Sequence, residues 1–144
     1  MSLSYSGWNT HRKCAAKYKY SYIDKLPQPP VGAAADRGTR IHKSVEDYIA
    51  GASAGLDEEI HKKHGKYVFL LNNNYECTPE YKWAFDNKWK PVEFKSKKAR
   101  VRGVIDLKHD TNAHEWKTGK IHEDHLYQNH LYGMVLLLTH PEPP

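Results

Sequence analysis

The chain has few cysteines and no long apolar run, and both absences exclude classes of protein. Cys14 and Cys77 are its only cysteines, so it cannot supply the four thiolates of an iron–sulfur cluster. The pair could form one disulfide, but so few cysteines favour a reducing cytosol, and we expect a cytoplasmic protein. No stretch of about 18 apolar residues is present, so no membrane partner is expected. The N-terminus also lacks the basic and then apolar pattern of a signal peptide.

What is present suits one folded domain with an anionic partner. At 144 residues the chain is long enough to bury a core, and we expect a single domain over residues 1–144. Its net charge of +5 fits a polyanion, although many small basic proteins bind none. Ten Tyr and four Trp can pack a core or stack on bases.

The stretch 99–120, ARVRGVIDLKHDTNAHEWKTGK, has the pattern of a β-hairpin. Residues 101–107 are β-branched and apolar with alternating faces, which predicts a strand. The run HDTNA at 109–113 has the residues of a tight turn. Residues 114–118 then form the predicted return strand. A hairpin that is symmetric about Asp110 and Thr111 would place Asp106 directly opposite Glu115.

Two carboxylates at opposed positions suggest a cation site. Like charges that face each other across a strand pair are destabilising, and a cation between them would remove that cost. Oxygen ligands favour a hard ion such as Mg²⁺ or Mn²⁺. Lys117 shares a face with Glu115 and could orient a water or stabilise negative charge. The alternative is an ordinary charged hairpin face.

Periodicity places the remaining elements around this hairpin. Ser4 or Ser6 is the expected N-cap of the first helix. Asp86–Asn87 is the expected turn of a second strand pair, in which residues 89–94 return. The predicted helices cover residues 7–24, 33–50, 56–72 and 121–140, and the second strand pair covers residues 75–94.

Three motifs carry a family resemblance: Gly103-Val-Ile-Asp106, Glu115-Trp-Lys117 and Gln128-x3-Tyr132. In this order they resemble the PD-(D/E)XK nuclease superfamily, in the branch of RecB-type, CRISPR-associated and viral exonucleases, here without the iron–sulfur cluster of some relatives. Ile105 stands where the motif name has Pro. The resemblance implies an α/β (α+β) fold with a restriction-endonuclease-like core. In that fold a small mixed β-sheet of about four strands is flanked by helices, and the N-terminal helices come first.

The resemblance also implies roles for single residues. Gly38-x3-His42-x3-Glu46 is similar to the family helix whose His reaches the metal ions, and the alternative for His42 is a structural role. Glu80 best fits the Glu that faces the site from the strand before the hairpin, with Glu76 and Glu93 as rivals and a surface carboxylate as the alternative. The implied metal ligands, for two Mg²⁺ or Mn²⁺ ions, are His42, Asp106, Glu115, the backbone carbonyl of Trp116, and Glu80. The implied catalytic residues are Lys117, Asp106, Glu115, Gln128 and Tyr132.

Four basic residues are candidate DNA contacts: Arg12, Arg37, Arg40 and Lys120. A solvated surface charge is the alternative for each. The resemblance implies a metal-dependent exonuclease acting on linear DNA in recombination, repair or DNA degradation, in a bacterium or a virus-infected cell. A structure-specific endonuclease and a catalytically silent DNA-binding module remain as alternatives. Assembly into a homo-oligomer, or binding to a recombination partner protein, is a further possibility.

Overall fold

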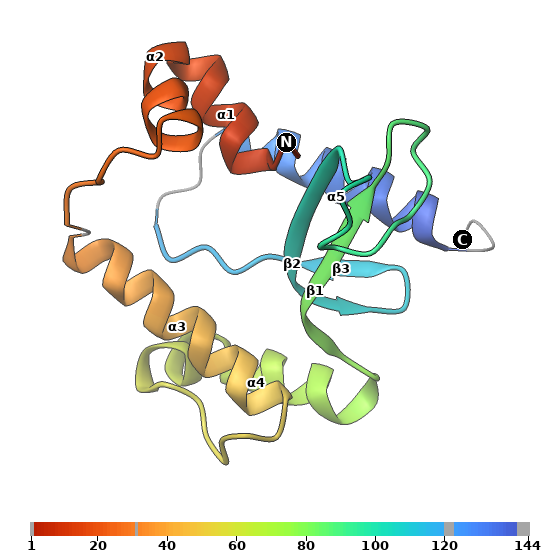
Figure 1. Ribbon diagram of the computed structural model, residues 1–144. Helices are drawn as coiled ribbons and strands as arrows, with labels where there is room; N and C mark the ends of the chain where they lie inside the picture. The colour runs from red at the N-terminus through yellow and green to blue at the C-terminus, as the bar shows by residue number, and fades with distance from the viewer. Residues whose placement is uncertain (1, 31, 120–122, 141–144) are drawn as a thin grey trace. The chain divides into compact units, whose positions relative to one another are not determined.

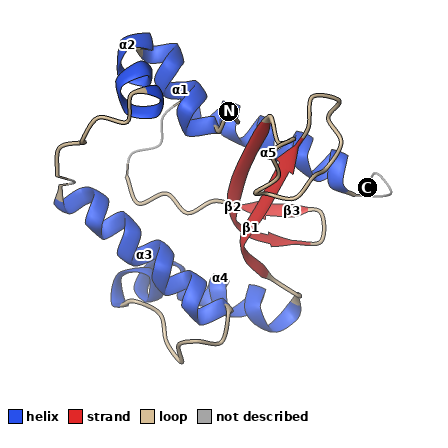
Figure 2. Cartoon of the chain, viewed as in Figure 1, coloured by secondary structure: helices blue, strands red, loops and turns tan. Residues whose placement is uncertain are grey.

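The computed structural model describes residues 2–30, 32–119 and 123–140 (Figure 1). The described chain divides into two compact units, one formed by residues 1–31 with 82–103 and the other by residues 32–81 with 104–144. Figure 2 shows helices and strands in both parts of the chain. In chain order the elements are α1 (Tyr5–Lys13), α2 (Ala15–Tyr18), the π-helical turn η1 (Lys19–Ile23), α3 (Ala33–Ile49), α4 (Glu58–Asn74), β1 (Thr78–Phe85), β2 (Val101–His109), β3 (Asn112–His114) and α5 (Asp124–Thr139).

The first unit begins with helices that are interrupted at Cys14. The Ser4 side chain accepts a hydrogen bond from the Gly7 amide, which confirms Ser4 as the N-cap of α1. The single helix predicted over residues 7–24 is wrong, because Cys14 has an extended backbone, with φ −160° and ψ 102°. Its thiol accepts a hydrogen bond from the Lys17 amide at 3.4 Å, so Cys14 ends α1 and caps α2.

The second half of this unit has one strand where the sequence predicted two. The turn at Asp86 is confirmed, since its carboxylate accepts from the Lys88 and Lys90 amides at 2.8 and 3.0 Å. The return strand predicted over residues 89–94 is wrong: the segment makes only an isolated bridge between Phe85 and Pro91. The bridge has backbone hydrogen bonds on both sides, from the Asp86 amide to the Lys90 carbonyl and from the Val92 amide to the Ala84 carbonyl, so it does not need an N–H at Pro91. The pairing goes no further because the chain then turns, with the Ser96 amide donating to the Glu93 carbonyl.

In the second unit, α3 and α4 form a hydrophobic core. The helices predicted over residues 33–50 and 56–72 are confirmed to within two residues at each end. Ile41 and Val45 from α3 pack with Ile60 and Val68 from α4, and Trp116 packs against this cluster. Burial of these apolar faces is what holds the two helices together.

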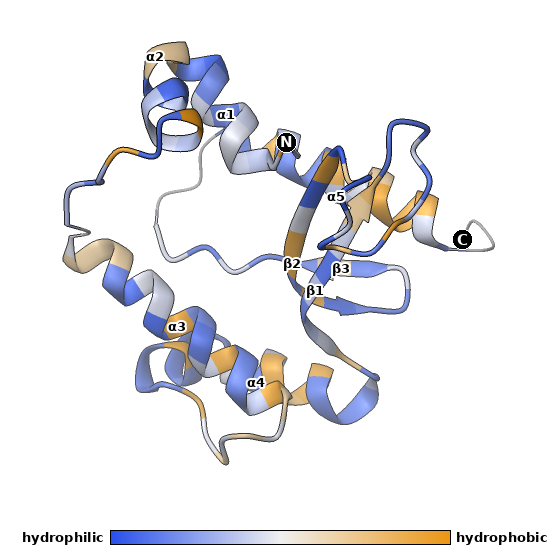
Figure 3. Cartoon of the chain, viewed as in Figure 1, coloured by the Kyte–Doolittle hydropathy of each residue, from blue (hydrophilic) through white to orange (hydrophobic). Residues whose placement is uncertain are grey.

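The last helix, α5, confirms the helix predicted over residues 121–140, of which residues 121 and 122 lie outside the described chain. Its buried residues are Gln128, Tyr132 and Val135, three or four positions apart. The apolar run toward its C-terminal end is visible in Figure 3. Leu137 and Leu138 in that run are exposed. No helix among the described residues is long and apolar enough to cross a membrane.

The three strands form one sheet in the order β1-β2-β3. β2 and β3 are antiparallel, and their pairs Leu107↔His114 and His109↔Asn112 confirm a hairpin symmetric about residues 110 and 111. Asp110 takes a left-handed φ of 44°, which Asp tolerates better than most residues. The parallel bridge between Leu3 and Val101 is isolated and adds no strand to the sheet. The sheet has three antiparallel strands, whereas the sequence predicted a mixed sheet of about four.

The return strand of the hairpin is shorter than predicted. It ends at His114, whereas the sequence predicted that it would continue to Thr118. The strand ends there because, two residues further on, the Trp116 amide donates to the side chain of Asp106 at 2.8 Å. A strand ladder needs backbone carbonyl acceptors, and here a carboxylate replaces one. The α/β fold class itself is confirmed, with helices preceding the sheet.

Candidate active site

The hairpin brings Asp106 and Glu115 to one place, as the register predicts. Their side chains are only 14% and 15% exposed. Asp106 Oδ2 accepts from the Trp116 amide and lies 3.3 Å from Nδ1 of His42, which comes from α3. The hydrogen bond with Asp106 raises the pKa of His42 against the effect of burial, and Glu115 and the backbone of Trp116 raise it further. His42, both carboxylates and the Trp116 backbone therefore lie close together.

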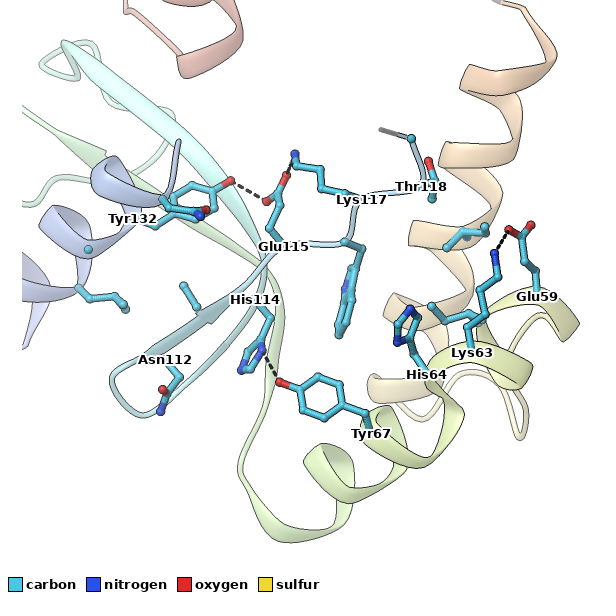
Figure 4. Close-up of a pocket in the computed structure, with 18 of the residues that line it drawn as sticks. Glu59, Lys63, His64, Tyr67, Asn112, His114, Glu115, Lys117, Thr118 and Tyr132 are labelled. Atoms are coloured by element: carbon cyan, nitrogen blue, oxygen red, sulfur yellow. Dashed lines mark hydrogen bonds and ion pairs between the residues drawn. The ribbon is translucent and has the colours of Figure 1, made fainter. Parts of the chain in front are cut away.

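Glu115 is held by three side chains. Lys117 Nζ lies 2.5 Å from Glu115 Oε1, and Gln128 Nε2 donates to the same oxygen at 2.9 Å. Tyr132 Oη donates to Glu115 Oε2 at 2.8 Å. Figure 4 shows Lys117 and Tyr132 reaching Glu115 from opposite sides. Two of the three holding residues lie on α5, so this helix orients a carboxylate of the hairpin segment.

The same residues also bond to one another. Lys117 Nζ donates to Gln128 Oε1 at 3.0 Å, and Gln128 Nε2 donates to Tyr132 Oη at 2.7 Å. Burial raises the pKa of Tyr132, and the neighbouring Glu115 raises it further. The hydroxyl therefore remains a neutral hydrogen-bond donor. The network joins four of the five residues that were predicted to be catalytic, and the fifth, Asp106, accepts from the Trp116 amide instead.

The donor chemistry of this cluster fits a hard divalent ion. Two nearly buried carboxylates provide oxygen ligands, and the Trp116 carbonyl and His42 lie beside them. In the described chain no three His, Cys, Asp or Glu side chains converge closely enough to hold a metal by themselves. Protein donors occupy the carboxylate oxygens instead, and a bound ion would have to replace some of these donors.

Two arginines predicted to contact phosphate are engaged with carboxylates. Arg37 Nε donates to Glu59 Oε2 at 2.9 Å, and its Nη1 donates to the Thr118 carbonyl at 2.8 Å. Arg40 pairs with Asp57, the N-cap of α4. Arg37 lowers the pKa of Glu59 to about 2. Arg37 thus ties α3 to the start of α4 and to the segment that carries Lys117, and phosphate binding by either arginine stays a prediction.

Three other predicted site residues are not brought into this network by the contacts described above. Glu80 lies in β1, half-buried, with a left-handed φ of 50° that is uncommon for a residue other than glycine. Arg12 lies in α1, where its guanidinium donates to Asn9 Oδ1 at 3.2 Å and lies 5.5 Å from the ring centre of Trp8. Lys120 lies outside the described residues. Metal binding by Glu80 and DNA binding by Arg12 and Lys120 stay predictions.

A cavity of about 820 Å³ opens beside Glu115 and Lys117 (Figure 4). Its walls come from α3, from α4, from the hairpin with the segment after it, and from α5. The sequence interpretation missed Tyr67 and His114, which line it and are joined by a hydrogen bond of 2.9 Å. Positions 60, 64, 67 and 71 fall on one helical stripe, and that spacing is the signal that could have indicated Tyr67.

A strand aspartate, a nearby Glu-x-Lys and a supporting Gln and Tyr are the residues that the sequence predicted for a nuclease site. The family model of the PD-(D/E)XK nuclease superfamily matches residues 2–144, and the chain belongs to this superfamily. Its members are nucleases, which makes DNA the substrate, and they generally use divalent metals such as Mg²⁺ or Mn²⁺. No curated protein and no solved structure matches the chain. The predicted superfamily is confirmed, and the narrower branch stays a prediction.

Proposed function

We propose that the chain is a Mg²⁺- or Mn²⁺-dependent exonuclease that hydrolyses phosphodiester bonds of linear DNA. The observation that carries this proposal is the ion pair of Lys117 with Glu115 beside Asp106, whose carboxylate accepts from the amide of Trp116, the residue between Glu115 and Lys117. Its preference for DNA ends follows from the resemblance to the exonuclease branch. The same resemblance favours a role in viral or bacterial recombination, repair or DNA degradation, in the cytoplasm of a bacterium or of an infected host cell.

Five groups would hold the metal ions. Asp106 and Glu115 would each supply a carboxylate oxygen, the Trp116 backbone would supply its carbonyl, and His42 with Glu80 would complete a second position. When bound, such an ion polarises the phosphoryl oxygens and stabilises the charge that develops during hydrolysis.

The chain's own residues position the reactants. The Lys117 ammonium has three N–H donors, of which two reach Glu115 and Gln128. Its third donor would orient the attacking water and stabilise negative charge on the phosphate. Gln128 and Tyr132 fix the Glu115 carboxylate, so that it keeps its direction when Lys117 turns toward substrate. A preoriented site of this kind needs little rearrangement during the reaction.

Digestion of three matched substrates tests the proposal. The purified protein is given end-labelled linear duplex, linear single strand and covalently closed circular DNA, in Mg²⁺, Mn²⁺ or a chelator. Lys117→Ala and Asp106→Asn are compared with Lys62→Ala, which removes an exposed lysine that pairs with Glu58 on α4. We expect loss of linear DNA from its ends only with metal, intact circles, and a drop of about a hundredfold or more for the first two variants.

Other outcomes select the alternatives. Cutting of closed circles would identify an endonuclease, because a circle offers no end. DNA binding without cutting in any metal would identify a catalytically silent binding module. If Lys62→Ala lost as much activity as Lys117→Ala, the Lys117 ammonium would have no special role and the assigned mechanism would fail.

A further inference from the structure

The cavity beside Glu115 and Lys117 has the size and position of a substrate pocket. Its volume of about 820 Å³ lies within the range of about 300–1,000 Å³ that is typical of ligand pockets. Because Glu115 and Lys117 form part of its wall, an occupant would lie directly against the candidate catalytic groups. Figure 4 shows these two residues at one side of the cavity and the Tyr67–His114 pair at another.

A row of stacked aromatic rings, with the buried His109 in its middle, ends at this cavity. Tyr75 and His109 stack with ring centres 4.3 Å apart and an interplanar angle of 29°. His109 and His114 follow at 5.0 Å and 18°, and His114 and Trp116 at 6.3 Å and 17°. The row arises because the hairpin register places positions 109 and 114 on the same face of the sheet. It ends at Trp116, which lines the cavity.

Tyr67 adds a second ring from α4. Its side chain is 45% exposed, yet its hydroxyl is held by the 2.9 Å hydrogen bond to His114 Nδ1. The ring therefore keeps its orientation while part of it faces solvent. A ring fixed in advance loses little side-chain entropy when a planar ligand stacks on it.

The charged groups of the cavity wall are paired with one another. Glu59 pairs with Arg37 and Lys63, and Glu115 pairs with Lys117. A phosphate placed against Arg37 or Lys63 would have to displace Glu59 from them. An uncharged base needs no such displacement, and stacking on aromatic rings contributes to its binding whatever its identity.

We propose that this cavity binds an unpaired nucleobase of the strand that is cut, which makes single-stranded DNA and frayed DNA ends the preferred substrate class. The inference rests on the proposed nuclease function. The faces of a paired base are covered by its neighbours in the duplex, so a base must leave the duplex before it can stack on Tyr67 or Trp116. Leaving the duplex costs a few kcal/mol and disfavours fully paired DNA.

Binding of a fluorescent base tests the pocket separately from hydrolysis. A single strand that carries 2-aminopurine at its end is titrated with protein in chelator, where no metal-dependent cutting occurs, and a blunt duplex with the same label serves as comparison. Stacking quenches 2-aminopurine, so we expect quenching on the single strand and little on the duplex. Tyr67→Ala should weaken the affinity for the single strand roughly 5- to 150-fold, the loss expected for one stacked base.

Two matched variants separate stacking from other effects. Tyr67→Phe keeps the ring and loses only the hydroxyl, so it should retain most of the quenching. Tyr20→Ala removes an exposed tyrosine that is not among the residues lining the cavity and should bind like the unchanged protein. The same four proteins are then assayed in Mg²⁺ for the ratio of single-strand to duplex digestion, which should fall only for Tyr67→Ala.

The outcomes distinguish the two proposals. If the unchanged protein digests a blunt duplex as fast as a single strand, and Tyr67→Ala behaves identically, the pocket inference is overturned while the nuclease function stands. If 2-aminopurine is quenched in a Tyr67-dependent way but no DNA is cut in any metal, the pocket stands and the proposed nuclease function fails.

Discussion

Replacing Tyr132 with phenylalanine removes a single hydroxyl from the centre of the site. Tyr132 is only 6% exposed, and its Oη lies 2.8 Å from Glu115 Oε2 and 3.1 Å from the Val104 carbonyl. Gln128 Nε2 also donates to this oxygen at 2.7 Å. The substitution keeps the ring and the packing of α5, so its effect reports the hydrogen bonds alone.

The size of the effect follows from the charge of the acceptor. A hydrogen bond to a charged group contributes about 1.5–3 kcal/mol to the free energy of unfolding. At this chain length a loss of 1 kcal/mol lowers Tm by about 2–4 °C, so Tyr132→Phe should lower Tm by roughly 3–12 °C. Residues that orient a metal ligand typically contribute 10- to 100-fold to activity or metal affinity, and we expect a loss of that order.

Thermal unfolding followed by circular dichroism and metal-dependent DNA digestion measure the two effects. Tyr20→Phe, at an exposed position in the other unit, is the control and should change neither quantity. If Tyr132→Phe keeps both the Tm and the activity of the unchanged protein, Lys117 and Gln128 alone fix Glu115. The assigned role of the tyrosine in orienting the carboxylate would then be refuted.

Two further predictions concern stability. Arg37 lowers the pKa of Glu59 to about 2 from an ordinary 4.5, so the ionised Glu59 stabilises the fold above about pH 4.5 and loses that contribution as the pH falls toward 2. The difference in Tm between the unchanged protein and Glu59→Gln should therefore become smaller between pH 4.5 and pH 2. A difference in Tm that stays constant over this range would contradict the pairing of Glu59 with Arg37. A Cβ at Gly103 would lie 2.6 Å from Cζ2 of Trp83, so Gly103→Ala should cost about 1–3 kcal/mol in denaturant unfolding. Gly133→Ala, on α5 with open space at its Cβ, is the matched control and should not destabilise.

The sequence predicted those features of the site that depend on local pattern. Alternating residues in β2 and the short turn after it determine the hairpin register, and the register places Asp106 and Glu115 on one face. Apolar residues at helical spacing in α3 and α4 likewise indicated which faces would be buried. Both patterns extend over only a few residues, so they can be recognised in the sequence without knowledge of the tertiary structure.

Other local features were mispredicted, in two cases because a side chain replaced a backbone partner. The return strand stops at His114 since the Trp116 amide bonds to Asp106, and the first helix stops at Cys14, whose thiol caps the next helix. Residues 89–94 make only the isolated bridge at Pro91, because the chain turns directly after it, where the Ser96 amide donates to the Glu93 carbonyl. Helix and strand propensities do not predict the first two departures, because each one depends on where one particular side chain points.

By itself, then, the sequence determined the hairpin, the three long helices and the residue types of a metal-dependent nuclease. Only the tertiary structure decided which distant groups meet. Arg37 reaches a carbonyl 81 positions away, at Thr118, and α5 delivers Gln128 and Tyr132 to Glu115. The cavity lined by Tyr67 and His114 is equally a product of packing. Contacts of this kind depend on how whole helices are placed against the sheet. Apolar periodicity shows which face of a helix is buried, but it does not show against which other element that face packs.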